Sequence, residues 1–273
     1  VGSVRDLEAR GPAGPIPLRS YRPLHGAADA ALPVLAYFHG GGWVIGDLDT
    51  HDDVCRLLCR EAGVQVLSVA HRQAPEHPFP AGLNDALAAM RWASLHASAW
   101  GIDAKSIAIG GDSSGANLAC VAAHQLAREG MPPMAQCLFY PGTDLVTERP
   151  SLSAYGHGLF LTVPERAWFY GHYLGDEPMA RDDPRISPLW QKDVSLMPPT
   201  VLCTANLDML RDEGLAFAQV LRKARVTLRH HEAQGLGHGF VNLIGVHGAS
   251  RRMVRQMAAS LRDVVLTHAF RAR

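Results

Sequence analysis

Several features that would indicate particular protein classes are missing from this sequence. It has no run of about 18 apolar residues, so it predicts no membrane span. Lysine and arginine together number 26, and so do aspartate and glutamate, so no excess charge favours a nucleic acid or an anionic membrane as partner. No two of the five cysteines form a CxxC pair, which leaves no sign of a redox motif or a zinc site. A small neutral molecule is the partner that this composition favours.

The cysteines favour a reducing compartment. They are odd in number in a long chain, and four of them lie in apolar patterns, which is typical of buried free thiols. We therefore expect a cytoplasmic protein. The sequence begins at Val1 rather than at methionine, and we expect that residues before it, with any targeting segment or N-terminal cap, are absent from it.

The length of 273 residues and the hydrophobic content of 47% suit one α/β domain over residues 1–273. Two β-like runs open the chain around a Gly-Pro-Ala-Gly turn and predict an antiparallel hairpin. The later apolar runs alternate with helical patterns, and most are continuously apolar, as in parallel strands covered on both faces. We predict a doubly wound fold with a mostly parallel central sheet of about eight strands flanked by helices. The predicted strands are 3–10, 16–23, 34–38, 64–70, 106–109, 135–140, 200–204 and 226–232, and the predicted helices are 52–62, 81–97, 115–128, 213–224 and 250–269.

Residues 149–192 interrupt this alternation. They contain seven aromatic residues among prolines, glycines and charges, with a helical pattern at 164–174. Aromatic insertions in α/β enzymes often form lids over the substrate. We interpret the segment as a cap insertion at one end of the sheet. The alternative is a surface excursion with its own small apolar cluster.

The strongest chemical motif lies in residues 106–118. An apolar, β-branched run breaks at a pair of glycines and continues with helix-favouring residues, which predicts a strand, a sharp turn and a helix. GDSSG at 111–115 matches G-x-S-x-G, in which a strained turn lifts a serine hydroxyl above a parallel sheet. Ser113 is therefore the candidate nucleophile.

A second motif, HGGGW at 39–43, directly follows the predicted strand 34–38. Consecutive glycines at the carboxyl end of a strand can turn free N–H groups inward, which a developing oxyanion requires. We interpret the motif as an oxyanion hole, with the N–H of Ser114 as a further donor; a flexible turn is the alternative. We expect His39 to support the glycine loop by hydrogen bonding.

The candidate base is His238. A serine hydroxyl needs a base to become nucleophilic, and the motif predicts the chain order Ser, Asp or Glu, His. His238 lies in a glycine-flanked loop, 235–240, just after the last predicted strand, so it can reach Ser113. We interpret the other candidate histidines as structural: His230 and His231 lie inside a strand, and His247 lies near the terminal helix.

The candidate acid is Asp208, which follows the predicted strand 200–204. The next strand leads to His238, so adjacent strand ends can bring the two side chains into contact. Asp144 also follows a strand end and is the alternative. Asp212 and Glu213 are interpreted as structural acids in the first turn of a helix.

Together the motifs resemble the hormone-sensitive lipase family of α/β-hydrolase esterases. The resemblance runs nearly end to end, through HGGGW at 39–43, HRQAPEHPFPA at 71–81, GDSSG at 111–115, DMLRDEG at 208–214 and HGF at 238–240. It implies a triad of Ser113, Asp208 and His238, and an oxyanion hole formed by the N–H groups of Gly41, Gly42 and Ser114. It also implies hydrolysis of short- to medium-chain acyl esters with no cofactor or metal. The family's cap usually combines N-terminal helices with an insertion like 149–192, and we expect the N-terminal part to be absent from this sequence.

The sequence departs from the family pattern at four positions. His71 replaces a common tyrosine, Gln73 a leucine, Ala116 a glycine and Met209 a proline. None of these changes removes a group of the predicted triad.

The sequence therefore predicts a serine carboxylesterase that acts on a small-molecule ester through an acyl-enzyme. Trp43, Met209 and Phe240 are candidate substrate-binding residues. An acyltransferase or an amidase with the same triad is an alternative, as is a non-catalytic small-molecule receptor on the same fold. The last strand would be a sheet edge able to pair with a second copy in a homodimer.

Overall fold

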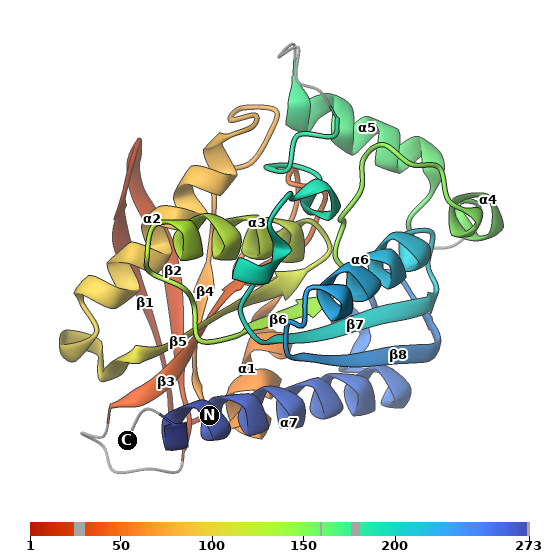
Figure 1. Ribbon diagram of the computed structural model, residues 1–273. Coiled ribbons are helices and arrows are strands. Elements are labelled where there is room, and N and C mark those ends of the chain that lie inside the picture. The colour runs from red at the N-terminus through yellow and green to blue at the C-terminus, as the bar shows by residue number, and fades with distance from the viewer. Residues whose placement is uncertain (25–30, 159, 176–180, 272–273) are drawn as a thin grey trace.

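One sheet runs through the centre of the molecule (Figure 1). The computed structural model describes residues 1–24, 31–158, 160–175 and 181–271. Its eight strands are β1 (Ser3–Gly11), β2 (Gly14–Arg22), β3 (Leu32–Phe38), β4 (Gln65–Val69), β5 (Ile102–Asp112), β6 (Gln136–Phe139), β7 (Thr200–Leu207) and β8 (Leu228–Gly237). Their order is β1-β2-β4-β3-β5-β6-β7-β8. The first two strands pair antiparallel with each other and β2 pairs antiparallel with β4, whereas all later neighbours are parallel.

The burial of each strand follows its place in the sheet. Every residue of β4 and β6 is buried, because helices cover both faces of these parallel strands. In β2 and β8 buried and exposed residues are mixed, as expected nearer the edges. The predicted α/β-hydrolase sheet is confirmed, although β5 begins at Ile102, four residues earlier than predicted. Ile102 pairs with Leu32 across an irregularity in the β3–β5 register.

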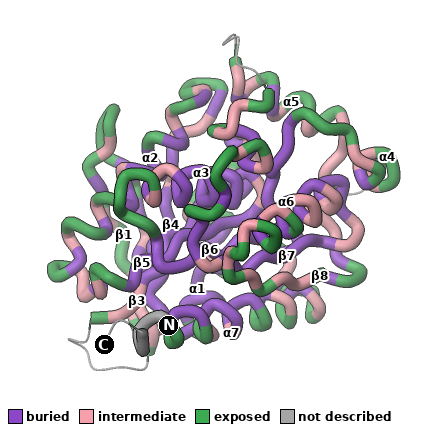
Figure 2. Tube along the Cα trace, viewed as in Figure 1, coloured by how far each residue is buried: buried purple, intermediate pink, exposed green. Residues whose placement is uncertain are grey.

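Helices pack on both faces of the sheet. Figure 1 shows α1 (Asp52–Ala62) and α7 (Gly248–Arg271) below it, and α2 (Ala81–Leu95), α3 (Ser114–Arg128) and α6 (Arg211–Lys223) above it. An apolar cluster fills each interface: one contains Phe38, Leu118 and Phe217, and the other contains Leu58, Phe139 and Leu261. Buried residues accordingly follow the central strands and the inner helix faces (Figure 2). All five cysteines are buried and free, as predicted.

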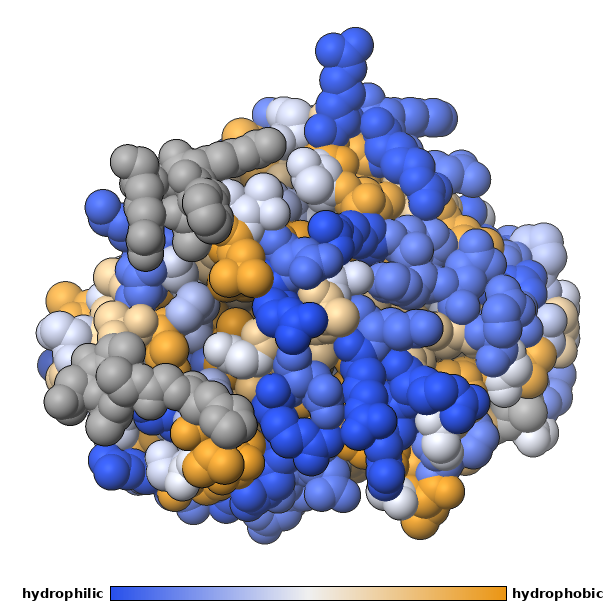
Figure 3. Space-filling view, turned by 90° about the horizontal axis from the view of Figure 1, so that it is seen from below, coloured by the Kyte–Doolittle hydropathy of each residue, from blue (hydrophilic) through white to orange (hydrophobic). Residues whose placement is uncertain are grey.

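The outer face of the lower layer is polar. Seen from the side of α7, the surface is mostly hydrophilic with scattered apolar residues (Figure 3). Arg251, Arg255 and Arg262 of α7 are among its exposed side chains. Among the described residues, no helix combines the length and the apolar character that a membrane crossing needs.

The segment 149–192 lies at the carboxyl end of the parallel strands. It contains the short helix α4 (Pro150–Tyr155), which the sequence did not predict, and α5 (Val163–Leu174), which matches the helix predicted at 164–174. Thr162 caps α5 in a capping box with Glu165. The Tyr173 ring of α5 stacks on Trp43 with 4.1 Å between ring centroids, which places α5 over the loop after β3. Residues 159 and 176–180 of this predicted cap lie outside the described residues.

Candidate active site

Ser113 occupies a strained turn between β5 and α3. Its φ of 53° and ψ of −121° are unfavourable for any residue with a side chain, which is the geometry expected of a nucleophile turn. A side chain at either Gly111 or Gly115 would collide with the carbonyl oxygen of Phe38, so the close approach of β3, β5 and α3 requires both glycines. The turn therefore projects the Ser113 hydroxyl from the end of the sheet.

The three residues predicted to form the triad are in contact. Ser113 Oγ lies 2.8 Å from His238 Nε2, and His238 Nδ1 lies 2.8 Å from Asp208 Oδ2. Asp208 follows β7 and His238 follows β8, which are neighbouring parallel strands, so both side chains leave the same edge of the sheet. Leu210 N donates to the other Asp208 oxygen at 2.9 Å and fixes the orientation of the carboxylate.

The electrostatics of this chain of contacts favour proton transfer from serine. A carboxylate only accepts hydrogen bonds, so Nδ1 carries a hydrogen and the lone pair of Nε2 faces the Ser113 hydroxyl. Burial alone would lower the pKa of His238, but the Asp208 charge and hydrogen bond raise it above its ordinary value. The imidazole is thus a stronger base than a free histidine and can hold the serine proton.

The glycine loop lies beside the nucleophile turn. Gly41 (φ 120°) and Gly42 (φ 60°) adopt backbone conformations that favour glycine, and the next residue, Trp43, donates its N–H to Ser114 Oγ at 3.2 Å. Gly41, Gly42 and Ser114 all line the same cavity as Ser113. The arrangement brings the backbone of the glycine loop and the start of α3 to one side of the Ser113 hydroxyl.

His39 supports this loop from beneath. Its Nδ1 lies 2.8 Å from the carbonyl oxygen of Gly40, and its ring stacks on His71 with 4.4 Å between centroids. Burial lowers the pKa of His39 to about 3, so the ring is neutral and Nδ1 donates to the carbonyl. These are the contacts expected of a supporting residue.

A cavity of about 300 Å³ opens above Ser113 and His238. One side is formed by the glycine loop, including Trp43. The other side is formed by residues of the segment 149–192: Phe160, Leu161, Arg166, Phe169 and Tyr170. The cavity therefore lies between the sheet and this segment.

Two predicted substrate-binding residues do not lie at this cavity. Met209 is 3% exposed, and its carbonyl oxygen accepts from Ser151 Oγ. Phe240 is 1% exposed and packs edge-on against Phe139 and Tyr140. Among the described residues the neighbours Leu210 and Gly239 line the cavity instead. Both side chains therefore turn into the core and not toward the cavity.

The other acidic candidates have structural partners. Asp144 pairs with Arg149 at 2.9 Å and accepts from Trp190 Nε1 at 3.0 Å. Glu213 is buried in the first turn of α6 and accepts from the N–H of Thr143 at 2.6 Å. Burial raises the pKa of Glu213 to about 7, although the Arg166 charge acts in the opposite direction. Asp212, in the same turn, accepts from Ser151 N at 2.9 Å.

The other candidate histidines contact hydroxyl groups of other residues and not that of Ser113. His230 lies 3.0 Å from Thr204 Oγ1, and His231 lies 2.9 Å from Ser260 Oγ. His247 lies 2.9 Å from Ser250 Oγ at the start of α7. Across the described parts of the chain, no group of three or more His, Cys, Asp or Glu residues could hold a metal ion.

Sequence reasoning missed three polar residues at the site. Arg166 lines the cavity from α5, and its Nε donates to Tyr170 Oη at 3.0 Å. Asp112 and His51 form a buried pair beneath the Ser113 turn. The position of Asp112, directly before the nucleophile, was the one available indication of its importance.

Known proteins resemble this chain in sequence and in structure. A family described as "alpha/beta hydrolase fold" matches residues 35–242. The carboxylic ester hydrolase LipN of Mycobacterium tuberculosis is 44% identical over 266 residues, which cover 95% of this chain and 70% of LipN. The ethyl acetate hydrolase of Pseudomonas putida is 41% identical over 230 residues, covering 84% of this chain and 72% of that enzyme.

Solved structures agree with these relatives. The esterase of Pyrobaculum calidifontis superimposes with a TM-score of 0.91 at 37% identity, covering 96% of this chain and 86% of that one. An alpha/beta hydrolase enzyme from the metagenome of Lake Arreo, crystallised as a mutant, gives a TM-score of 0.93 at 39% identity and covers 96% and 83% of the two chains.

Proposed function

The chain belongs to the alpha/beta hydrolase fold family, in its hormone-sensitive lipase branch, and is an ester hydrolase; we propose that Ser113, His238 and Asp208 are its catalytic triad. The observation that carries this proposal is the unbroken series of contacts from Asp208 through His238 to Ser113, with both distances at 2.8 Å. It has the geometry in which a base activates a serine and an acid orients that base.

In the first half of the reaction, Ser113 Oγ attacks the ester carbonyl carbon while His238 Nε2 takes the hydroxyl proton. The carbonyl oxygen becomes an oxyanion, which accepts hydrogen bonds from the N–H groups of Gly41, Gly42 and Ser114. The C–O bond to the alcohol then breaks, and His238 returns its proton to the leaving oxygen. The product is an acyl-enzyme on Ser113.

In the second half, water takes the place of the alcohol. His238 removes a proton from the water, whose oxygen attacks the acyl carbon and forms a second oxyanion at the same donors. The bond to Ser113 Oγ breaks, and the proton returns from His238 to the serine. Asp208 remains ionised throughout and stabilises the imidazolium in each half.

The cavity supports short- to medium-chain acyl esters as substrates. Its volume of about 300 Å³ lies at the small end of ligand sites, and side chains such as Phe160, Leu161 and Phe169 form an apolar wall. We propose residues 149–192 as the cap of a single domain that spans 1–273. No cofactor or metal takes part in the proposed steps.

Two broader properties are also part of the proposal. β8 ends the sheet, which supports pairing with a second copy in a homodimer along that edge. The five buried free cysteines support a reducing, cytoplasmic location.

The experiment is a series of p-nitrophenyl esters from acetate to dodecanoate, with the wild-type chain and Ser113→Ala. We expect the highest kcat/KM at short to medium acyl lengths and a loss of kcat of about 10⁵-fold or more in Ser113→Ala. The variant should keep the wild-type melting temperature, because the hydroxyl lies in the cavity. Near wild-type turnover by Ser113→Ala would contradict the assignment. Addition of alcohols to the assay detects acyl transfer. A matched p-nitroanilide substrate detects amide hydrolysis.

A further inference from the structure

A second aspartate–histidine pair lies beneath the Ser113 turn. His51 Nε2 is 3.2 Å from Asp112 Oδ1, and each side chain is only 3% exposed. His51 immediately precedes α1, and Asp112 is the last residue of β5. The catalytic steps proposed above do not use this pair. A charge so deeply buried is costly unless it is compensated, so the pair needs an explanation.

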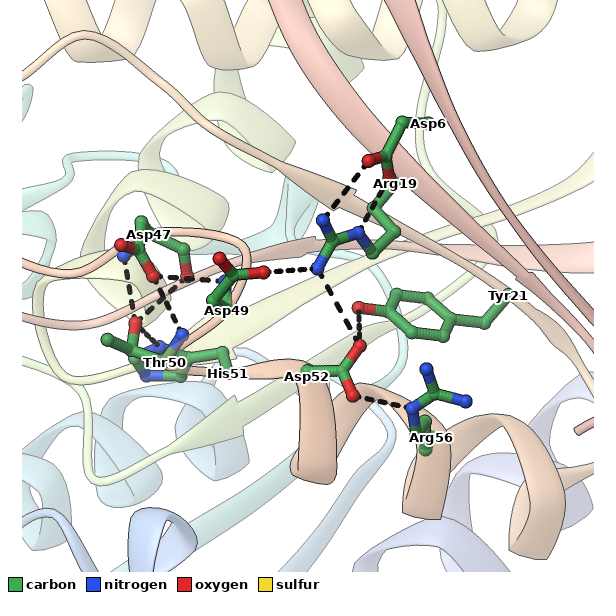
Figure 4. A network of polar contacts seen from close by, with 9 residues as sticks. All are labelled: Asp6, Arg19, Tyr21, Asp47, Asp49, Thr50, His51, Asp52 and Arg56. Carbon is green, nitrogen blue, oxygen red and sulfur yellow. Dashed lines mark hydrogen bonds and ion pairs between the residues drawn. The ribbon is translucent and has the colours of Figure 1, made fainter.

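The contacts of His51 fit a positively charged ring. Nε2 faces the Asp112 carboxylate, which can only accept, so this nitrogen carries a hydrogen. Nδ1 lies 3.0 Å from Thr50 Oγ1, whose own hydrogen is donated to the carbonyl oxygen of Asp47 at 2.9 Å. Thr50 Oγ1 is thus placed to accept from Nδ1 (Figure 4). With a hydrogen on both nitrogens, His51 donates to both neighbours as an imidazolium.

The surrounding groups favour this charge. Burial would lower the pKa of His51, but the charge and hydrogen bonding of Asp112, with a contribution from Asp47, raise it above its ordinary value. The rings of His39 and Tyr37 lie 5.6 and 6.4 Å away. Burial lowers the pKa of His39 and of the nearby His71, and raises that of Tyr37, so all three are neutral. The Asp112 carboxylate and the His51 ring are therefore the two oppositely charged groups in this buried region.

Asp112 connects the loops of the active site. Its Oδ1 accepts from the N–H of Gly40, at the start of the glycine loop, at 3.0 Å. Tyr140 donates its hydroxyl to Oδ2 at 3.4 Å, and the same hydroxyl accepts from Val241 N, three residues after His238, at 3.4 Å. Tyr37 adds a donor at 2.9 Å. One carboxylate thus joins the nucleophile turn, the glycine loop and the loop that carries His238.

We propose that His51 is a positioning residue for ester hydrolysis: its imidazolium neutralises Asp112, so that this carboxylate holds the three loops without opposing the oxyanion. The inference rests on the proposed function, since the oxyanion is that of the Ser113 reaction. An uncompensated Asp112 anion beneath the glycine loop would repel the negative charge that forms in the transition state.

A network of ion pairs and hydrogen bonds at the surface of the same loop offers a control. Arg19 of β2 pairs with Asp6 and Asp49, each at 2.6 Å, and Asp52 accepts from Tyr21 Oη at 2.8 Å (Figure 4). The network anchors the loop before α1 to the antiparallel end of the sheet. Asp49 is exposed, so Asp49→Asn removes an ion pair of the same loop without changing the charge at Asp112.

The test is a double-mutant cycle of His51→Gln, Asp112→Asn and the double variant, with Asp49→Asn as control. We expect His51→Gln to lower kcat by about tenfold or more while KM changes less than about twofold. The reason is that the negative charge repelled by an uncompensated Asp112 anion forms only in the transition state. The double variant should be faster than His51→Gln, because it removes that anion. Asp49→Asn should keep the wild-type kcat. A His51→Gln kcat within about twofold of wild type, or losses that simply multiply in the double variant, would overturn the proposal.

A second measurement on the wild-type chain does not depend on how the variants fold. In a chain labelled with ¹⁵N-histidine, the His51 ring can be assigned through its contacts with the Tyr37 and His39 rings. We expect both of its ring nitrogens to be protonated at pH 7. A neutral His51 ring at pH 7 would overturn the charge assignment. That result leaves the Ser113→Ala comparison unaffected, so failure of this inference and failure of the proposed function are distinguishable.

Discussion

Two aspartate–histidine pairs flank the Ser113 turn, and the second nitrogen of each imidazole distinguishes them. His238 Nδ1 contacts Asp208, and its Nε2 faces a serine hydroxyl, which can give up a hydrogen. His51 Nε2 contacts Asp112, and its Nδ1 faces a hydroxyl whose hydrogen is already donated elsewhere. The first ring can therefore accept a proton from its neighbour, whereas the second is placed to donate from both nitrogens.

An Asp–His contact alone does not define a catalytic pair. Both pairs combine the same two residue types, and in both the carboxylate raises the pKa of the histidine. His238 adjoins the cavity, while His51 lies behind the sheet end among buried rings. The surroundings of the second nitrogen decide whether the pair transfers a proton or supplies a fixed charge.

The largest expected effect comes from breaking the reactive pair. Asp208→Asn replaces the acceptor that holds Nδ1–H, so the imidazole can turn its lone pair away from Ser113. We expect kcat to fall by about 10⁴-fold, as measured with p-nitrophenyl butyrate. The matched control is Asp144→Asn, whose carboxylate pairs with Arg149 instead. If Asp144→Asn lost more activity than Asp208→Asn, Asp144 would be the acid of the triad.

An intermediate effect is expected at the glycine loop, which Asp112 holds through Gly40. Gly42 has φ 60°, and a side chain there would collide with the Phe169 ring. Gly42→Ala should therefore displace an oxyanion donor and lower kcat by about 10²- to 10³-fold.

Gly63→Ala is its control, because Gly63 also has a positive φ of 69° but nothing lies within 4 Å of an added side chain. It ends α1 far from the cavity and should lower the melting temperature while kcat stays unchanged. Equal kcat values for the two variants would show that the glycine loop supplies no oxyanion donor.

The smallest effect is a shift of the pH profile, and it separates the two histidines. The Asp208 charge raises the pKa of His238 above 6.5, and activity requires the neutral ring. kcat should therefore decline as the pH falls through that raised pKa, by about tenfold per unit below it. His51 takes no proton in the proposed steps, so we expect it to add no acid limb. A midpoint below 6.5 would contradict the assigned charge environment of His238.

Much of the fold could be predicted because periodicity is a local property. Continuously apolar runs identified the buried parallel strands, such as 64–70, and glycines marked the hairpin turn of β1 and β2. The first residues of β5 were missed because Asp103 and Lys105 interrupt the apolar pattern, and tertiary pairing with Leu32 makes them a strand nonetheless. α4 has six residues, too few for a helical period to be visible.

The candidate site, like the fold, could be predicted only in part. Ser113, Asp208 and His238 could be proposed because each follows a recognisable strand end within a motif. The sequence could not show that Met209 and Phe240 face the core instead of the cavity, since the direction of a side chain in a loop depends on packing. The contact between His51 and Asp112 joins residues far apart in sequence, and the sequence contains no pattern that pairs them.

In the proposed reaction Ser113, and not its neighbour Ser114, carries the acyl group. Ser114 is 3% exposed, and its Oγ accepts from Trp43 N, so its hydroxyl is held away from the reaction. The direct measurement is to react the chain with diethyl p-nitrophenyl phosphate and locate the adduct by peptide mass spectrometry. We expect one diethylphosphoryl group per chain, on Ser113, with loss of activity in proportion. An adduct on Ser114, or full labelling with activity retained, would contradict it.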